Sequence, residues 1–295
     1  MRILLTGATG FLGSHLARML VGRGHEVLAF RRPTSDTSRL GDAAEQVRWF
    51  DAADPAAPFR SGPPPAAVVH CAALYGRRGE TIPDLIQANT LLPARLHRLA
   101  CDHGTARFIH TGTVLDPGLN PYALSKHHAT EWLRMAGGET RVVNLRVQHF
   151  YGPDDDPTKF VTGLIRRCLA GEPEIALTDG RQLRDFLHVD DVVGAMLLAI
   201  EDPAVPPTAA GRYVDVEVGS GEAVEVRRLV ELVHEFARGP TRLLFGALPH
   251  RPGEPMHTCA DITQLRSWGW RPLVPLAEGL RLTVESERAK GARPI

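Results

Sequence analysis

The stretch MRILLTGATGFLG, residues 1–13, decides the fold of this chain. Residues 2–6 read as a short buried strand, and an apolar-periodic helix is predicted to follow the glycines. Gly7, Gly10 and Gly13 recur every three residues between the two. A strand that runs through glycines into a helix lets the backbone approach a pyrophosphate, which binds at the free N–H groups and positive dipole end of the helix. The alternative is a glycine-rich turn that serves packing only.

Outward from this stretch, short apolar segments alternate with helical ones. Strands that alternate with helices predict an α/β fold with a doubly wound parallel sheet, the Rossmann arrangement. The predicted strands are 2–6, 25–30, 47–50, 66–71, 107–111 and 141–147, and two of the predicted helices are 81–101 and 121–135.

The sequence pattern of predicted strands and helices changes after Gly152-Pro153. We therefore expect a dinucleotide-binding domain at 1–148, whose sheet is completed by part of 187–220, and a smaller α/β substrate-binding domain at 149–295. In the second part the expected strands are 174–177, 212–218 and 241–245, and the expected helices are 158–170, 191–201 with Asp190 or Asp191 as N-cap, 223–238, 261–268 and 276–288.

Composition excludes several classes of protein. The 295 residues are 43% hydrophobic and 23% charged with a formal net charge of zero, which is typical of a soluble globular protein and gives no electrostatic case for nucleic acid or an anionic membrane. The four cysteines show no CxxC or Cys/His ligand spacing, so we expect reduced thiols and no metal site. No signal peptide or membrane-spanning stretch is evident, so a cytoplasmic location is expected.

The end of the second predicted strand carries Arg31 and Arg32, followed by Pro33, Thr34 and Ser35. In a dinucleotide fold an acid at this place binds the ribose 2′-hydroxyl, whereas an Arg pairs with a 2′-phosphate. Arg31 therefore favours NADP(H) as cofactor. The alternative is a solvated pair of arginines in an Arg-rich protein.

The ends of two other strands also lie where open α/β sheets bind ligands. Asp51 is placed to contact an adenine, and His70 with Cys71 ends the strand at 66–71. A single histidine at such a position is more often structural than catalytic.

Tyr122 and Lys126 form the sharpest chemical signal. They lie one turn apart on one face of the helix that Asn120-Pro121 opens. A nearby ammonium stabilises a phenolate and lowers its pKa from about 10, so Tyr122 is expected to pass a proton to or from a carbinol oxygen. Thr113, at the end of the neighbouring strand, supplies a hydroxyl that orients the same oxygen.

Taken together, these features resemble an extended short-chain dehydrogenase/reductase of the NAD-dependent epimerase/dehydratase superfamily. The matching segments are GATGFLG (7–13), VVHCAA (68–73), Asn89, TGT (111–113), YALSK (122–126), FYGP (150–153), RDFLHVDDV (184–192), VGSG (218–221) and RPGE (251–254). The resemblance implies cofactor contacts from Gly7, Thr9, Gly10, Phe11, Leu12, Gly13, Arg31, Arg32, Asp51, Ala52, Cys71, Ala72, Ala73, Asn89, Thr111, Tyr122 and Lys126.

The same resemblance implies that the second part of the chain binds a nucleoside-diphospho-sugar. Arg184 and Arg251 would grip its diphosphate, since the planar guanidinium suits that group. His149 stands where many members carry a substrate-binding Asn, and Lys159 is placed to reach the sugar or the diphosphate. A solvated lysine at a helix start is the alternative for Lys159.

Departures from the family pattern narrow the reaction. The 4,6-dehydratases of the family carry Asp-Glu after the hydroxyl residue, whereas Val114 and Leu115 follow Thr113 here. The runs 114–126, 144–160 and 177–193 are similar to CDP-abequose and CDP-paratose synthases, which are NDP-4-keto-hexose reductases. The resemblance thus implies NADPH-dependent reduction of the 4-keto group of a nucleotide-activated 4-keto-6-deoxy or 3,6-dideoxy hexose.

Two other functions stay open. One is an NDP-sugar 4-epimerase with tightly bound NAD(P), and the other is a non-catalytic dinucleotide-sensing or partner-binding module on the same fold. The helices at 81–101 and 121–135 would form the four-helix bundle of a homodimer, as in related enzymes, or would pack only within the monomer.

Overall fold

The computed structural model describes residues 1–205, 211–251 and 253–291. The chain divides into two compact units, which both draw on separate stretches of sequence. Unit 1 comprises Met1–Val147 with Val193–Glu217, and unit 2 comprises Gln148–Val192 with Val218–Ile295. The assignment of NADP to the first part of the chain and of the nucleotide sugar to the second stays a prediction.

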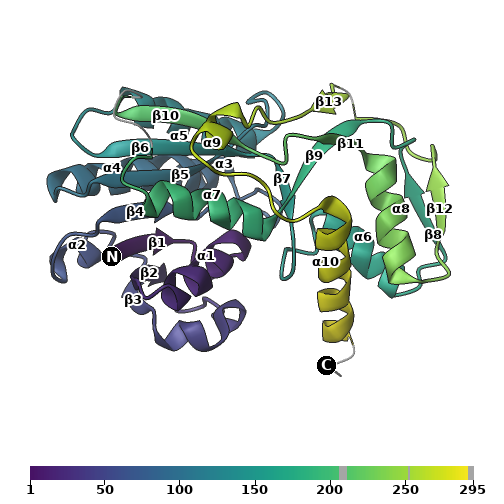
Figure 1. Cartoon of the computed structure of the whole chain (residues 1–295), viewed down its shortest axis with the longest axis horizontal. Helices are drawn as coiled ribbons and strands as arrows, with labels where there is room; N and C mark the ends of the chain where they lie inside the picture. The colour runs from purple at the N-terminus through teal and green to yellow at the C-terminus, as the bar shows by residue number, and fades with distance from the viewer. Residues whose placement is uncertain (206–210, 252, 292–295) are drawn as a thin grey trace. The chain divides into compact units, whose positions relative to one another are not determined.

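Unit 1 is built on a seven-stranded sheet with helices on both faces (Figure 1). The pairs from β6 to β3 are parallel, so the predicted α/β doubly wound fold is confirmed. The chain order reverses between β1 and β4, where folds of this kind bind ligands at the carboxyl ends of the strands. In spatial order the strands are β10 (Tyr213–Val218), β6 (Arg141–Val147), β5 (Arg107–Thr113), β4 (Ala67–His70), β1 (Arg2–Thr6), β2 (Glu26–Arg31) and β3 (Arg48–Asp51).

Apolar side chains of alternate strand residues form the core of unit 1. Leu4, Val68 and Phe108 of the sheet pack with Leu96 of α4 (Leu92–Asp102) and Leu133 of α5 (Pro121–Met135). The helix α1 (Phe11–Gly22) covers the opposite face, as Figure 1 shows. These strands are apolar on both sides because helices cover both faces.

Glycine is needed at the positions between β1 and α1 for different physical reasons. Gly7 has φ +72°, and a Cβ there would meet the Ala72 nitrogen at 2.7 Å. A Cβ on Gly13 would meet the Gly7 carbonyl oxygen at 2.0 Å. Packing therefore accounts for these two, while Gly10 is less crowded and caps α1 with no side-chain hydrogen bond.

The predicted helix at 81–101 is interrupted in its middle. It consists of α3 (Ile82–Ile86), the π-helical segment η2 (Gln87–Leu91) and α4. Thr81 caps α3 through a capping box with Asp84. The π segment holds the buried Asn89, and such single-turn insertions often lie at functional sites.

Unit 2 contains a four-stranded and a two-stranded sheet. In the first, β9 (Leu183–His188) pairs with β7 (His149–Tyr151), β11 (Ala223–Glu225) and β13 (His257–Thr258). In the second, β8 (Glu174–Leu177) pairs with β12 (Arg242–Phe245). The helices are α6 (Phe160–Leu169), α8 (Val226–Ala237), α9 (Thr263–Ser267) and α10 (Leu276–Gly291). Leu164, Val230 and Val284 lie in a core that α6, α8 and α10 share.

Two local predictions for unit 2 are wrong. The helix expected at 223–238 begins only at Val226, because Ala223–Glu225 pairs antiparallel with β9. The helix expected to be capped by Asp190 or Asp191 is α7 (Val189–Glu201), which begins before either residue. Asp191 instead accepts hydrogen bonds from the backbone nitrogens of Leu273 and Val274, at 2.8 and 3.1 Å.

Asp185 of β9 holds two loops of unit 2 together. Its buried carboxylate accepts hydrogen bonds from the backbone nitrogens of Ser220, Gly221 and Ala260 and from the Ser220 hydroxyl. We expect Asp185→Ala to lower the free energy of unfolding by about 3 kcal/mol or more, because several buried donors lose their acceptor. Urea unfolding measures the loss, and Asp42→Ala at an exposed position is the control, with an expected change below about 0.5 kcal/mol.

Candidate active site

The N-terminal turns of α5 carry two of the three predicted catalytic residues, Tyr122 and Lys126. The Asn120 side chain caps the helix by accepting a hydrogen bond from the Ala123 nitrogen at 2.8 Å, and Pro121 occupies the first helical position. Tyr122 and Lys126 thus lie one turn apart. Tyr122 is partly buried, and Lys126 is only 2% exposed.

Tyr122 has an aromatic neighbour that the sequence did not indicate. Its ring stacks on Tyr75, with 4.8 Å between centroids and 30° between planes. Burial and Tyr75 raise the pKa of Tyr122 well above 10, and Arg77 only partly offsets this. The predicted lowering of the Tyr122 pKa by Lys126 is therefore wrong for this structure. The phenol keeps its proton at neutral pH, which suits a proton donor.

Lys126 lies among neutral groups. Burial lowers the pKa of Lys126 to about 8, against a smaller opposite effect of Cys71. The fully buried rings of His70 and His110 stack at 5.4 Å, and burial together with the Lys126 ammonium holds both imidazole pKa values well below 6.5. His70 Nδ1 also forms a hydrogen bond with Thr6 Oγ1 at 2.9 Å, as expected of a structural histidine.

The predicted residues at the ends of β4 and β5 are connected. Thr111 donates from Oγ1 to Cys71 Sγ at 3.5 Å, and burial raises the pKa of the Cys71 thiol to about 11. Thr113 is the last residue of β5, and its hydroxyl accepts a hydrogen bond from the Leu115 nitrogen at 3.3 Å. Thr113 as a whole residue is partly exposed.

Asn89 ties the segment after β4 to α5. Its amide nitrogen donates to the Leu74 carbonyl at 2.8 Å and to Ser125 Oγ at 3.0 Å, and its oxygen accepts from the Leu74 nitrogen. In this structure Asn89 therefore supports the backbone beside Tyr75 and the helix that carries Tyr122. A direct contact of Asn89 with a cofactor stays a prediction.

A cavity of about 480 Å³ lies at the carboxyl ends of β2 and β3. It is lined by the predicted residues Arg31, Arg32 and Asp51, together with Pro33, Ser35, Trp49 and Phe50. The Arg31 guanidinium lies over the Trp49 ring at 5.6 Å, and the Ala52 nitrogen donates to the Arg31 carbonyl at 3.1 Å. The sequence analysis did not predict Trp49 as a site residue, because its contact with Arg31 depends on the pairing of β2 with β3.

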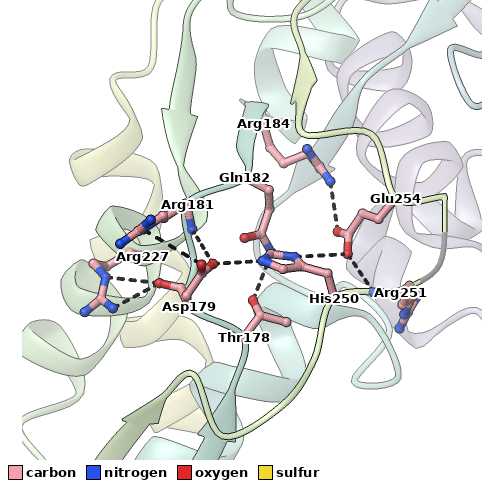
Figure 2. Close-up of polar contacts among 9 residues, drawn as sticks. All are labelled: Thr178, Asp179, Arg181, Gln182, Arg184, Arg227, His250, Arg251 and Glu254. Carbon is pink, nitrogen blue, oxygen red and sulfur yellow. Dashed lines mark hydrogen bonds and ion pairs between the residues drawn. The ribbon is translucent and has the colours of Figure 1, made fainter.

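In unit 2 the two predicted diphosphate arginines meet at Glu254, as Figure 2 shows. The Arg184 side chain, 8% exposed, forms an ion pair with Glu254 at 2.9 Å. The Arg251 backbone nitrogen donates to the other carboxylate oxygen of Glu254 at 3.4 Å. Glu254 was part of the RPGE motif, but no residue pattern indicated that it pairs with Arg184.

The other two predicted substrate residues have local partners. His149 is exposed and its ring lies 6.0 Å from that of Phe186. Lys159 forms an ion pair with Asp155 at 2.9 Å and lies over the Phe150 ring at 4.7 Å. Burial raises the pKa of Asp155, and Lys159 partly offsets the rise, so Lys159 has a structural duty whether or not it binds substrate.

A second cavity, of about 760 Å³, lies within unit 2. The predicted substrate residues His149, Lys159, Arg184 and Arg251 do not line it, although Phe186 does. Its charged lining residues are Glu222, Arg266 and Arg271.

Sequence comparison decides the family. Residues 3–214 match the NAD dependent epimerase/dehydratase family. The chain belongs to this family. It is 30% identical over 289 residues to the CDP-abequose synthase of Salmonella muenchen, with 95% of this chain and 96% of that one covered.

Two further similar proteins extend the comparison. The dTDP-4-dehydro-6-deoxy-D-allose reductase of Streptomyces bikiniensis is 28% identical over 299 residues, which cover 89% of each chain. The solved structure of MoeE5 in complex with UDP-glucuronic acid and NAD is 29% identical, has a TM-score of 0.81 and covers 98% of this chain and 100% of its own. The epimerase/dehydratase fold thus extends over nearly the whole chain, while the roles of individual residues stay predictions.

The described residues form neither a metal-binding cluster nor a helix able to cross a membrane. Within 1–205, 211–251 and 253–291, no three His, Cys, Asp or Glu side chains are arranged to hold a metal ion. Over the same ranges, every helix is too short or too polar to cross a membrane.

The stacked histidines should make this family member sensitive to acid. Because the pKa values of His70 and His110 in the folded state lie well below 6.5, the unfolded state binds more protons in that range. Stability is therefore expected to fall as the pH drops below about 6.5. His110→Phe removes one such group and keeps a ring on His70, so its unfolding free energy should fall less steeply. Urea unfolding at about pH 7 and about pH 5 tests this, and equal slopes would contradict it.

Proposed function

We propose that the chain reduces the 4-keto group of a nucleotide-activated 4-keto-6-deoxy or 4-keto-3,6-dideoxy hexose with NADPH. One observation carries the proposal: Tyr122 and Lys126 share a helix face in a chain that is 30% identical to a CDP-abequose synthase over 95% of its length. The dTDP-4-dehydro-6-deoxy-D-allose reductase among the relatives supports the same class of reaction.

The residues of unit 1 fit a nicotinamide dinucleotide. The positions of Gly7 and Gly13 leave no room for a Cβ, so the β1–α1 turn stays tight, and Gly10 leaves the helix N-terminus without a capping side chain. Such a turn is suited to a pyrophosphate. Thr9, Phe11, Leu12, Ala72 and Ala73 would complete this part of the site. When bound, the reduced nicotinamide supplies the hydride.

The chain's own residues supply the proton. Tyr122 is protonated at neutral pH because burial and Tyr75 raise its pKa, so it can donate to the C4 oxygen as charge develops there. Thr113 orients that oxygen through its hydroxyl. Lys126 contributes a positive charge beside the phenol and a donor for the nicotinamide ribose. Arg184 and Arg251 bind the diphosphate, and His149 and Lys159 bind the rest of the substrate.

We infer that the cofactor is NADP(H) from the cavity at Arg31. Arg31 and Arg32 both line it, and an acid at the end of β2, as expected for NAD, is absent because Arg31 holds that position. Trp49 beneath the Arg31 guanidinium would keep it in place. The family name and the NAD in the MoeE5 complex make NAD the alternative.

Arg31→Asp tests the cofactor preference. We expect kcat/KM with NADPH to fall about 100-fold, because a carboxylate replaces the partner of the 2′-phosphate, and kcat/KM with NADH to change little or rise. Steady-state kinetics with both cofactors measures the ratio. Arg48→Ala is the control, since Arg48 lies over Phe50 on the next strand but does not line the cavity. An unchanged ratio in Arg31→Asp would assign the preference elsewhere.

The reaction itself is tested by the absorbance of reduced nicotinamide. NADPH is mixed with the protein and a CDP- or dTDP-linked 4-keto-6-deoxy or 4-keto-3,6-dideoxy hexose. Stoichiometric loss of NADPH with formation of the 4-hydroxy sugar nucleotide supports the proposal. A new sugar nucleotide without cofactor loss identifies a 4-epimerase. Cofactor binding without any turnover favours the non-catalytic module.

We also propose a homodimer and a cytoplasmic location. Large apolar side chains are exposed on the helices predicted to form the dimer, namely Ile82, Ile86, Leu124, Trp132 and Met135. A second copy would cover such a surface. The cysteines are all free, which is typical of proteins in reducing compartments. Light scattering of the protein and of Trp132→Arg tests the dimer.

A further inference from the structure

His250 lies between two carboxylates from different segments of unit 2, as Figure 2 shows. Its Nε2 is 2.9 Å from Asp179 Oδ1, and its Nδ1 is 3.7 Å from Glu254 Oε2. The ring therefore hydrogen-bonds Asp179 through Nε2 and lies with Nδ1 close to Glu254, so it spans the space between the two acids.

Asp179 is firmly held in the turn between β8 and β9. Its carboxylate accepts from the Arg181 nitrogen at 3.1 Å, and its carbonyl accepts from Nε and a terminal nitrogen of Arg227 at 3.2 and 3.0 Å. The next residue, Gly180, has φ +77° and so little room that a Cβ would meet the Arg227 backbone at 2.9 Å. The His250 ring is thus attached to a fixed point.

The segment that carries His250 is tied to the same strands at its two ends. The Leu248 nitrogen donates to the Leu177 carbonyl at 2.9 Å, and the Met256 carbonyl accepts from the Leu183 nitrogen at 2.8 Å. Between these points, His250 to Asp179 is a side-chain link from the segment to the β8–β9 turn. It lies directly before Arg251.

Glu254 passes this constraint to both diphosphate arginines. One carboxylate oxygen holds the buried Arg184 guanidinium, and the other faces the Arg251 nitrogen and His250. The carboxylate of Glu254 also cancels part of the positive charge that a diphosphate would need. The charged groups around His250 are Asp179 and Glu254 in contact, with Arg181 and Arg184 as their partners.

We propose that His250 is a positioning residue for the diphosphate of the nucleotide sugar. It acts through Glu254, by fixing the carboxylate that orients Arg184 and the backbone of Arg251, and through Asp179, which anchors it. The inference rests on the proposed function, because it takes the two arginines as the diphosphate site. It assigns no role to His250 in proton or hydride transfer.

His250→Leu tests the role, since it removes both polar contacts of the ring. We expect KM for the sugar nucleotide to rise about ten-fold, with kcat and KM for NADPH changed less than about two-fold. His250→Gln places an amide nitrogen near the position of Nε2, so it should keep the contact with Asp179 and recover part of the loss. Asp179→Asn combined with His250→Leu should be no worse than His250→Leu alone, because the two residues act in one chain of contacts.

A matched histidine separates positioning from stability. His234 of α8 is also partly buried in unit 2 and bonds the Thr241 carbonyl through Nε2 at 2.7 Å. His234→Leu should lower the thermal midpoint as His250→Leu does but leave KM unchanged. A KM for His250→Leu within about two-fold of wild type, or an equal rise in His234→Leu, would overturn the inference.

Calorimetric titration with CDP distinguishes failure of this inference from failure of the proposed function. Suppose that the wild type binds CDP but reduces no 4-keto sugar, and that His250→Leu binds CDP about ten-fold more weakly than the wild type. The proposed reaction is then wrong and the positioning role stands. If the wild type reduces the substrate but His250→Leu has the KM and the CDP affinity of the wild type, only the inference is wrong. Failure of the wild type to bind CDP, UDP and dTDP would overturn both.

Discussion

Tyr122→Phe is expected to lower kcat for ketone reduction by about 1,000-fold, because removal of a general acid usually costs between about 100- and 10,000-fold. The substitution keeps the ring that stacks on Tyr75 at 4.8 Å and removes only the hydroxyl. NADPH should still bind, and the thermal midpoint should stay within a few degrees. Single-turnover measurement of NADPH oxidation isolates the chemical step from product release.

Tyr213→Phe is the matched control for Tyr122→Phe. Tyr213 also lies in unit 1 and donates its hydroxyl to Asp215 at 2.7 Å, but no part of the proposed chemistry uses it. We expect its kcat to stay near that of the wild type. If Tyr122→Phe kept more than about a tenth of the wild-type rate, another group would have to supply the proton.

Lys126→Met should give a protein that is more stable yet nearly inactive. Burial lowers the pKa of Lys126 from 10.5 to about 8, so the folded state holds the proton less firmly than the unfolded chain does. The interval corresponds to about 3 kcal/mol of destabilisation when the ammonium is charged. At pH 7 Lys126→Met should therefore raise the free energy of unfolding by a few kcal/mol, while kcat/KM falls about 100-fold or more.

The pH dependence gives Lys126→Met a second test. Between about pH 8 and about pH 10.5 the unfolded state binds more protons than the folded state, so wild-type stability rises through this window. The extra stability of Lys126→Met over the wild type should have its full size below about pH 8 and should shrink as the pH rises to about 10.5. Thermal midpoints of the two proteins across that range check the sign. A constant difference would mean that Lys126 is not the titrating group.

Local sequence patterns were sufficient for the parts of the site that lie on one element. The Tyr122–Lys126 spacing needed only a helix, and the Gly7 turn needed only a strand and a helix in order. The parallel sheet then followed from alternating elements, and its strand ends brought Arg31 and Asp51 to one cavity. Such features depend on short stretches of chain whose periodicity is visible in the sequence.

The features that the sequence did not reveal depend on contacts between distant residues. Burial, together with Tyr75, reverses the pKa shift that was expected for Tyr122. Tyr75 stacks on Tyr122 from a loop that follows another strand. The pairing of Glu254 with Arg184 joins residues 70 positions apart. Ala223–Glu225 was expected to be helical. It is a strand because it pairs with β9, which lies far upstream in the sequence. At Ala223–Glu225, strand pairing overrode the local helical propensity.

The interleaving of the two units has a consequence for synthesis of the protein on the ribosome. The first 147 residues contain six of the seven strands of unit 1, but β10, which covers the edge of β6, is made only at residues 213–218. Unit 2 likewise waits for β13 and α10 near the end of the chain. A nascent chain grows at about 5–20 residues per second, so the bare β6 edge is exposed for seconds. During that interval, chaperone binding or rapid synthesis of β10 would keep the open β6 edge from pairing with nascent chains on neighbouring ribosomes of the same mRNA.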